Sequence, residues 1–234
     1  MCITELKNEL NNLSNKEHAH ALQRFFKTGP GEYGEGDRFI GIKVPVLRSV
    51  AKKHHSLTYN ELEVLISSPI HEERLTALFI LIHKFKKADE SEKKNIFNFY
   101  IQHKKYINNW DLVDLSADKI AGAYLFNKDV SILFELADSE NLWDKRIALL
   151  SSFNFIKNGV FDISLQLAEK LLHDKHDLIH KGVGWMLREI GNRDINTLEG
   201  FLFKHYKSMP RTMLRYAIEK FPEAKRQQYL KGLI

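Results

Sequence analysis

The side chains that suggest chemistry in this sequence interrupt otherwise regular helical patterns. In residues 108–124, NNWDLVDLSADKIAGAY, apolar residues recur at helical spacing and predict one inward-facing stripe. Asp114 lies beside that stripe and Trp110 lies four residues earlier, so an indole and a carboxylate should share one edge of a helix. This is an unusual combination. Spacing alone still favours a simpler interpretation, in which Trp110 belongs to the core and Asp114 is a capping or ion-paired carboxylate.

Arg146 and Trp185 are two further residues whose type does not fit a plain helical stripe. Arg146 falls within the apolar face of residues 141–159, where a guanidinium is costly unless it meets a carboxylate or an anion such as phosphate. A buried ion pair and ligand binding fit that position equally well. Trp185 points away from the stripe of its helix, and we expect Gly182 and Gly184 to clear space around the indole. Such a tryptophan suits a flat nucleotide ligand, with packing on a neighbouring helix as the alternative.

Other reactive side chains are weak candidates for chemistry. The histidines at 173, 176 and 180 lack the paired pattern that fixes zinc geometry, so we predict no metal site. The single cysteine, Cys2, has no evident activating base and no partner for an internal disulfide. The glycine-rich segment 29–41 lacks the Gly-Lys-Ser/Thr ending of a phosphate-binding loop, and we interpret it as a flexible connection or lid.

Helices must position these residues, because apolar residues recur at helical spacing along nearly the whole chain while period-two alternation is scarce. Capping boxes of Ser14 with Glu17 and of Thr58 with Glu61 predict helix starts near residues 15 and 59. With boundaries good to about two to four residues, the predicted helices are 3–13, 15–28, 45–54, 59–67, 70–85, 91–105, 111–125, 129–138, 142–157, 162–173, 177–191, 195–207, 211–220 and 223–232.

The alternation of helices with short connections predicts antiparallel helix pairs stacked side by side, because helices of this length bury their apolar stripes only against neighbours. No sequence motif recurs at a fixed period. A HEAT-like helical-repeat fold is therefore favoured by architecture, and an irregular helical bundle is the alternative. No change of composition divides the 234 residues, which predicts a single domain over residues 1–234.

Composition narrows the class of protein without naming a partner. An apolar fraction of 44% and a charged fraction of 28% are ordinary for a globular domain and argue against disordered or fibrous classes. The net charge of +5 is compatible with nucleic acid but does not select it. The amphipathic N-terminus and the short apolar runs predict no signal peptide and no membrane span, and the lone cysteine favours the cytoplasm.

Six segments spread over most of the chain resemble, in order, those of the AlkD-type DNA alkylation repair glycosylases. They are RFFKTG, RFIGIKVPVLR, NNWDLVD, NLWDKRIAL, KGVGWMLREIGNRD and MPRTMLRYAIEKF. The resemblance implies the fold of that family, which is an all-α solenoid of antiparallel helix pairs, the HEAT-like repeats, with a concave DNA-binding face.

The resemblance also implies roles for individual residues. Trp110 and Asp114 are similar to the family's catalytic pair, Arg146 to its active-site arginine and Trp185 to its second catalytic tryptophan. Phe25 occupies a DNA-contacting aromatic position that is tyrosine in some members, so a stacking face is kept and a hydrogen-bond donor is lost. The basic residues expected to bind backbone phosphates are Arg146, Lys181, Arg188, Arg211 and Arg215.

The implied reaction is hydrolysis of the N-glycosidic bond of N3- or N7-alkylated purines, such as 3-methyladenine and 7-methylguanine, in double-stranded DNA. Asp114 would stabilise the oxocarbenium-like transition state and position a water as the nucleophile, so we expect no strand cleavage. We also expect that the protein needs no cofactor and is a monomer. Asp111, on the neighbouring flank, is expected to be the less sensitive carboxylate. The alternatives are a non-catalytic protein that binds branched DNA and a helical-repeat scaffold that binds another protein.

Overall fold

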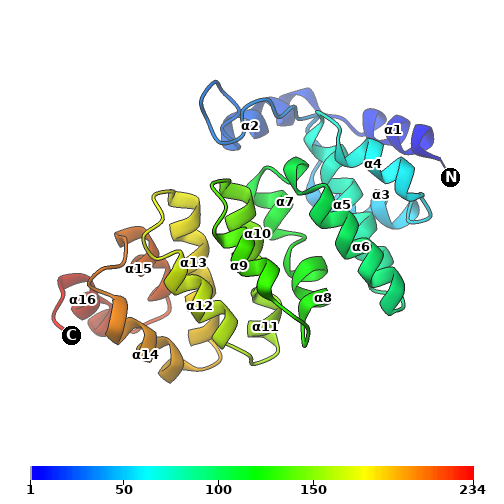
Figure 1. The fold of residues 1–234 in the computed structure, drawn as a ribbon. Coiled ribbons are helices and arrows are strands. Elements are labelled where there is room, and N and C mark those ends of the chain that lie inside the picture. Colours follow the sequence, from blue (N-terminus) through cyan, green and yellow to red (C-terminus); the bar gives the residue numbers. More distant parts are fainter. Residues whose placement is uncertain (1) are drawn as a thin grey trace. The chain divides into compact units, whose positions relative to one another are not determined.

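The computed structural model describes residues 2–234, and over that range it contains helices and no strand beyond an isolated bridge between Arg38 and Ile70 (Figure 1). The prediction of an all-α fold built from paired helices is confirmed. The contacts divide the chain into two compact units, Met1–Ser116 and Ala117–Ile234, and each unit is described by itself. The single domain and the concave DNA-binding face stay predictions.

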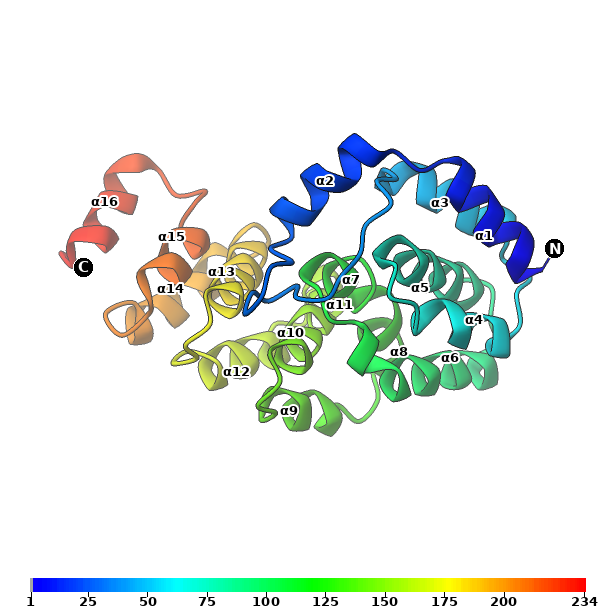
Figure 2. The ribbon, with the colours of Figure 1, turned by 90° about the horizontal axis from the view of Figure 1, so that it is seen from above.

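Unit 1 is organised around one buried helix. Its helices are α1 (Ile3–Asn12), α2 (Lys16–Phe25), α3 (Val44–Lys53), α4 (Tyr59–Ile66), α5 (His71–Phe85), α6 (Glu90–Gln102), the 3-10 helix η1 (Lys104–Tyr106) and α7 (Trp110–Asp114). Helix α5 contacts α3, α4, α6 and α7 (Figure 2), and nearly all of its side chains are buried. Because α5 carries the polar sequence His-Glu-Glu-Arg in its first turn, charged groups enter the interior of unit 1.

Unit 2 is arranged around α13. Its elements are the π-helix η2 (Asp118–Gly122), α8 (Ala123–Leu125), α9 (Ser131–Ala137), α10 (Leu142–Ser151), α11 (Phe153–Lys157), α12 (Asp162–Lys170), α13 (Asp177–Gly191), α14 (Ile195–His205), α15 (Arg211–Ala217) and α16 (Glu223–Lys231). Helix α13 contacts α10, α11, α12, α14 and α15 (Figure 1). Its buried side is the predicted apolar stripe, so the sequence period and the packing agree along this helix.

The start of α4 follows the sequence signal, whereas the start of α2 does not. At α4, Glu61 accepts a hydrogen bond from the backbone N–H of Thr58 at 2.9 Å, as the predicted capping box requires. The predicted cap at Ser14 is wrong. Asn15 is the N-cap of α2, and its side chain accepts from the N–H of His18 at 2.9 Å. The N–H of Asn15 bonds to the carbonyl of Ile40, which holds Asn15 extended and delays the helix by one residue.

Two predicted helices are interrupted where serine side chains bond to the backbone. The predicted helix 111–125 ends as α7 at Asp114 and resumes as η2, and Ser116 Oγ donates to the carbonyl of Leu112 at 2.5 Å between them. The predicted helix 142–157 breaks at Ser152, whose Oγ donates to the carbonyl of Leu149 at 2.7 Å. Serine offers the backbone an alternative hydrogen bond, so a continuous apolar stripe does not guarantee a continuous helix.

Candidate active site

The candidate catalytic pair lies at the two ends of the single turn of α7. Trp110 is the first residue of this helix and Asp114 the last. The buried side chain of Asn109 caps the turn and accepts a hydrogen bond from the N–H of Trp110 at 2.8 Å. Trp110 and Asp114 are both half-buried, so each has a face open to solvent within unit 1. The predicted proximity of the indole and the carboxylate therefore follows from one short, capped turn.

A row of aromatic rings holds the indole of Trp110. Phe26 stacks on Trp110 with ring centroids 5.0 Å apart, and Phe39 stacks on the other side of Phe26 at 4.9 Å. Phe25 meets Trp110 edge to face at 5.9 Å while 64% of its own surface is exposed. The structure thus brings Phe25 and Trp110 together. The exposed ring of Phe25 stands beside an indole whose orientation is fixed by stacking.

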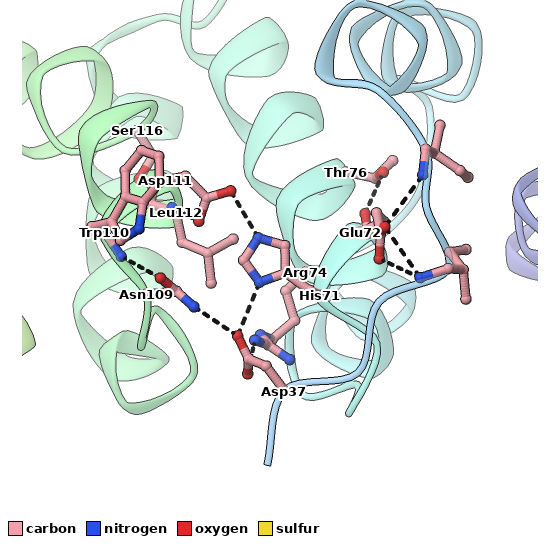
Figure 3. A network of polar contacts seen from close by, with 12 residues as sticks. Asp37, His71, Glu72, Arg74, Thr76, Asn109, Trp110, Asp111, Leu112 and Ser116 are labelled. Atoms are coloured by element: carbon pink, nitrogen blue, oxygen red, sulfur yellow. Dashed lines mark hydrogen bonds and ion pairs between the residues drawn. The ribbon is translucent and has the colours of Figure 1, made fainter. Parts of the chain in front are cut away.

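A buried polar network ties α7 to α5 (Figure 3). His71 contacts the carboxylate of Asp111 through Nε2 at 2.8 Å and that of Asp37 through Nδ1 at 3.0 Å. Asp37 also accepts from Arg74 at 2.5 Å and from Asn109 at 3.0 Å. Asn109 and Asp111 flank Trp110 in the sequence, so the network fixes the backbone on both sides of the indole.

Opposite charges stabilise this network. Burial alone would lower the pKa of His71, but the charge of Asp111 and hydrogen bonds to Asp111 and Asp37 outweigh it and raise the pKa to about 9. Burial would raise the pKa of Asp37, but the hydrogen bond from His71 and the charge of Arg74 hold it below its usual range. Within this network the two cations, His71 and Arg74, therefore face two carboxylates, and His71 is an imidazolium at neutral pH.

A second carboxylate fixes part of the glycine-rich segment. Glu72 accepts hydrogen bonds from three successive backbone N–H groups, those of Ile40, Gly41 and Ile42, at 2.8–3.3 Å. Gly41 has a φ of +84°, and a Cβ there would lie 2.1 Å from the carbonyl oxygen of Asn15. The interpretation of residues 29–41 as a flexible connection is therefore wrong for the end that contains Asp37 and residues 40–41.

In unit 2, Arg146 and Trp185 have different surroundings. Arg146 on α10 is buried, and its Nη1 donates to the carbonyl of Leu178 in the first turn of α13 at 2.5 Å. Trp185 on α13 is half-buried, its ring lies 5.7 Å from that of Phe153, and its Nε1 lies 3.4 Å from Glu189. Trp185 therefore lies outside the buried stripe, as its position in the sequence predicts.

The expectation that Gly182 and Gly184 clear space around Trp185 is wrong. A Cβ on Gly182 would lie 2.9 Å from Leu149 on α10, and one on Gly184 would lie 2.5 Å from the carbonyl oxygen of Met213 on α15. Both glycines are buried. They allow α13 to approach the helices on its two sides closely, which is a packing role rather than a ligand-binding one.

The basic residues expected to bind phosphate differ in how much their charge is compensated. Lys181 and Arg188 form ion pairs with carboxylates of unit 2, while Arg211 donates to the carbonyl of Leu230 at 2.7 Å. Arg215 is exposed and has no ion-pair partner among residues 2–234. Lys181 and Arg188 must therefore loosen existing pairs before they contact a phosphate, and Arg215 need not.

Comparison with known proteins gives the family. The model of a family described as DNA alkylation repair enzyme matches residues 6–221. The chain belongs to the DNA alkylation repair enzyme family. A solved structure described as a predicted DNA alkylation repair enzyme from Enterococcus faecalis is similar in fold, with a TM-score of 0.69, 17% sequence identity, and coverage of 90% of this chain and 97% of that one. No curated protein matches the sequence.

Membership in the DNA alkylation repair family implies that the protein acts on DNA. Sequence reasoning missed Asp37, His71 and Arg74 altogether. Asp111, which was expected to be less sensitive than Asp114, is 6% exposed and contacts His71, and its effect on excision stays a prediction. The available signal was the run of four polar residues, His71 to Arg74, that begins an otherwise apolar helix.

The remaining candidates in this DNA alkylation repair protein have structural roles. His176 caps α13 and accepts from the N–H of Leu178 at 3.1 Å, and His180 contacts the carbonyl of Asp174. Residues 2–234 contain no group of histidine, cysteine or acidic side chains arranged to hold a metal ion. In the same range, no helix is long and apolar enough to cross a membrane.

Proposed function

We propose that this protein is a monomeric, monofunctional DNA glycosylase of the cytoplasm that hydrolyses the N-glycosidic bond of N3- or N7-alkylated purines in double-stranded DNA without a cofactor. The observation that carries the proposal is the arrangement of α7. Trp110 and Asp114 lie one turn apart with partly exposed side chains, and a buried network holds the backbone on which they stand. Such preorganisation is what stabilising a short-lived cation requires.

The proposed chemistry needs little assistance at the leaving group. An alkylated purine is already cationic, so breaking the bond between C1′ and the purine nitrogen releases a neutral base and leaves positive charge on the sugar. The carboxylate of Asp114 stabilises that oxocarbenium-like sugar, and the π-face of Trp110 adds cation–π attraction. Water then forms the new bond to C1′, and its proton passes to Asp114 and on to solvent. No lysine adduct forms, so the strand remains intact.

Other residues contribute by contacting DNA. The exposed ring of Phe25 offers an apolar face beside Trp110, although it lacks the hydroxyl of a tyrosine. In unit 2 the proposal assigns the half-buried indole of Trp185 to the sugar and Arg146 to a phosphate, and Lys181, Arg188, Arg211 and Arg215 to further backbone phosphates. Phosphate contacts position the protein without reading base sequence.

The decisive experiment is release of free bases from methylated duplex DNA. The unmodified protein should release 7-methylguanine or 3-methyladenine and leave abasic strands that break only after alkaline treatment. Preference for branched over linear DNA without any release would replace the proposal by a non-catalytic DNA-structure binder. Indifference to DNA would favour a helical-repeat scaffold that binds another protein.

A further inference from the structure

A pocket of 230 Å³ lies on α3 and α5 of unit 1, two helices that carry none of the candidate catalytic residues. We name it the basic pocket because four of its side chains are basic. The residues that line it are Arg48, Lys52, Phe79, Ile82, His83 and Lys86. Since α3 and α5 pack directly against each other, the pocket is built on a rigid part of the unit.

The basic groups of this pocket converge from both helices. Arg48 and Lys52 are four residues apart on α3, so their side chains project from the same face. The guanidinium of Arg48 lies over the ring of Phe79 at 4.4 Å, and this contact holds it above α5. On the other side, the ring of His83 lies 5.2 Å from that of His55, which adds a further basic group beside the pocket.

No ion pair formed by residues 2–234 compensates the positive charge of Arg48, Lys52 and Lys86 in the basic pocket. Lys53, adjacent to Lys52, by contrast pairs with Glu9 at 2.9 Å. Acidic side chains are absent from its lining.

The lowered pKa of His83 is a further sign of the excess positive charge around the basic pocket. Burial lowers the pKa of His83 below its usual range, and the nearby charges of Lys87, His55, Lys52 and Lys86 lower it further. Of these groups, Lys52 lies on α3 and His55 follows that helix, while Lys86 and Lys87 follow α5. A group placed among them experiences a strongly positive potential, and an anionic ligand would relieve it.

We propose that the basic pocket binds a phosphodiester group of duplex DNA, outside the residues that would contact the lesion. The inference rests on the proposed function as a DNA-acting enzyme and adds a specific anchoring point to it. A planar guanidinium and two ammonium groups match the oxygens of a phosphate. The other side chains of the lining are apolar, apart from His83, and are not built to read base edges, so the contact should be independent of sequence.

The test compares two double variants with equal loss of charge in the same unit. Lys52→Gln/Lys86→Gln removes two ammonium groups of the basic pocket, and Lys93→Gln/Lys94→Gln removes two from α6. Binding to unmodified duplex DNA is titrated across salt concentrations. Because each neutralised phosphate contributes a slope of about 0.9 in log affinity against log salt, and the pocket holds one phosphate, the first variant should lose a slope of about 0.9 and bind about 8-fold more weakly near 0.1 M salt.

The control variant should keep the slope of the unmodified protein. Equal slopes for the two variants, or no change in either, would overturn the proposal, and thermal melting confirms that both variants fold. Occupancy is read directly from the imidazole NMR signal of His83, whose pKa should rise when DNA is added because a phosphate offsets the neighbouring cations. An unchanged His83 titration in the DNA complex would also overturn it.

The same samples separate this proposal from the proposed function. Assayed on methylated DNA, an unmodified protein that releases no base but loses salt slope in Lys52→Gln/Lys86→Gln would refute the glycosylase and support the basic pocket. Base release with an unaltered slope in that variant would do the reverse. Failure of the unmodified protein to bind duplex DNA would refute both.

Discussion

The buried network around His71 in unit 1 and the buried carboxylate of Asp118 in unit 2 are held in contrasting ways. In unit 1, Asp37 and Asp111 meet His71 and Arg74, and all four side chains are shielded from solvent. In unit 2, the buried Asp118 is held by two lysines that are 33% and 37% exposed. When one side chain is removed from the buried network, no water is at hand to solvate the charge that it leaves behind. The partly exposed lysines beside Asp118, by contrast, remain hydrated when their ion pair is broken. The contrast separates a buried network, in which every partner is shielded, from a buried carboxylate whose lysine partners remain in contact with solvent.

Removing His71 should have the largest effect, because it leaves buried carboxylates without their shared partner. His71→Ala is expected to lower the free energy of unfolding by about 3–5 kcal/mol. Lys157→Ala, which removes one lysine from Asp118, should cost about 1 kcal/mol or less, because Lys119 remains. Denaturant unfolding of both variants measures the difference. Equal losses would show that the buried network of unit 1 has no special role.

Removing the charge of Asp114 should affect the reaction and leave the fold intact. Asp114→Asn keeps the shape but loses the negative charge that would stabilise the sugar cation, so excision should fall by about 10²–10³, or about 2.7–4 kcal/mol of barrier. Single-turnover release of 7-methylguanine measures the rate, beside DNA-binding and thermal-melt assays.

The control for Asp114 must be an exposed carboxylate. Asp111 is unsuitable because its contact with His71 makes any substitution there a change in the network. Glu17→Gln on α2 is the better control and should excise at the unmodified rate. An Asp114→Asn protein that folds, binds and excises as fast as this control would remove Asp114 from the mechanism.

The two tryptophans of unit 2 offer a matched pair. Trp143 on α10 is only 8% exposed, so Trp143→Ala should cost about 3–5 kcal/mol of stability. Trp185 is half-buried, and Trp185→Ala should cost clearly less while slowing excision about tenfold through lost cation–π attraction. Chemical denaturation and single-turnover kinetics test both. A loss of stability at Trp185 as large as that at Trp143 would make it a core residue.

The pKa values of two histidines are shifted in opposite directions, so their contributions to stability should change with pH in opposite ways. The pKa of His71 is raised to about 9, so the stability that it contributes is complete below its unfolded pKa of about 6.5 and is lost as the pH rises toward 9. Burial lowers the pKa of His176 in unit 2, despite the charges of Asp174 and Asp177, so its contribution is present above about 6.5 and is lost as the pH falls. Imidazole NMR titrations measure both, and titration of His71 below 6.5 would contradict the charged network.

The helices could be predicted because their signal is local. Residues 177–191 form α13 with the predicted bounds, since an apolar period within one segment determines which face is buried. The interruptions could not be predicted, because they depend on serine side chains that bond to the backbone once neighbours have packed. The start of α2 likewise depends on a hydrogen bond between Asn15 and Ile40.

Of the candidate site, the sequence allowed us to predict only the proximity of residues that lie within one helical turn of each other. Trp110 and Asp114 are four residues apart, so spacing alone placed them on one edge. His71, by contrast, contacts carboxylates that lie 34 and 40 positions away in the chain, and no pattern of local spacing encodes such pairs. Their only local trace is a polar run at the start of a buried helix, which indicates buried charge without naming its partners.

The carboxylate of Glu72 has a consequence for hydrogen exchange. The amide protons of residues 40–42 belong to a loop, and loop amides ordinarily exchange with solvent through small local openings. Here each of them donates to a side chain anchored in the first turn of α5. These amides become accessible only when the loop leaves α5, which exposes the buried carboxylate. We therefore expect them to exchange as slowly as the core of α5, so that a stretch of irregular chain belongs to the most protected part of unit 1.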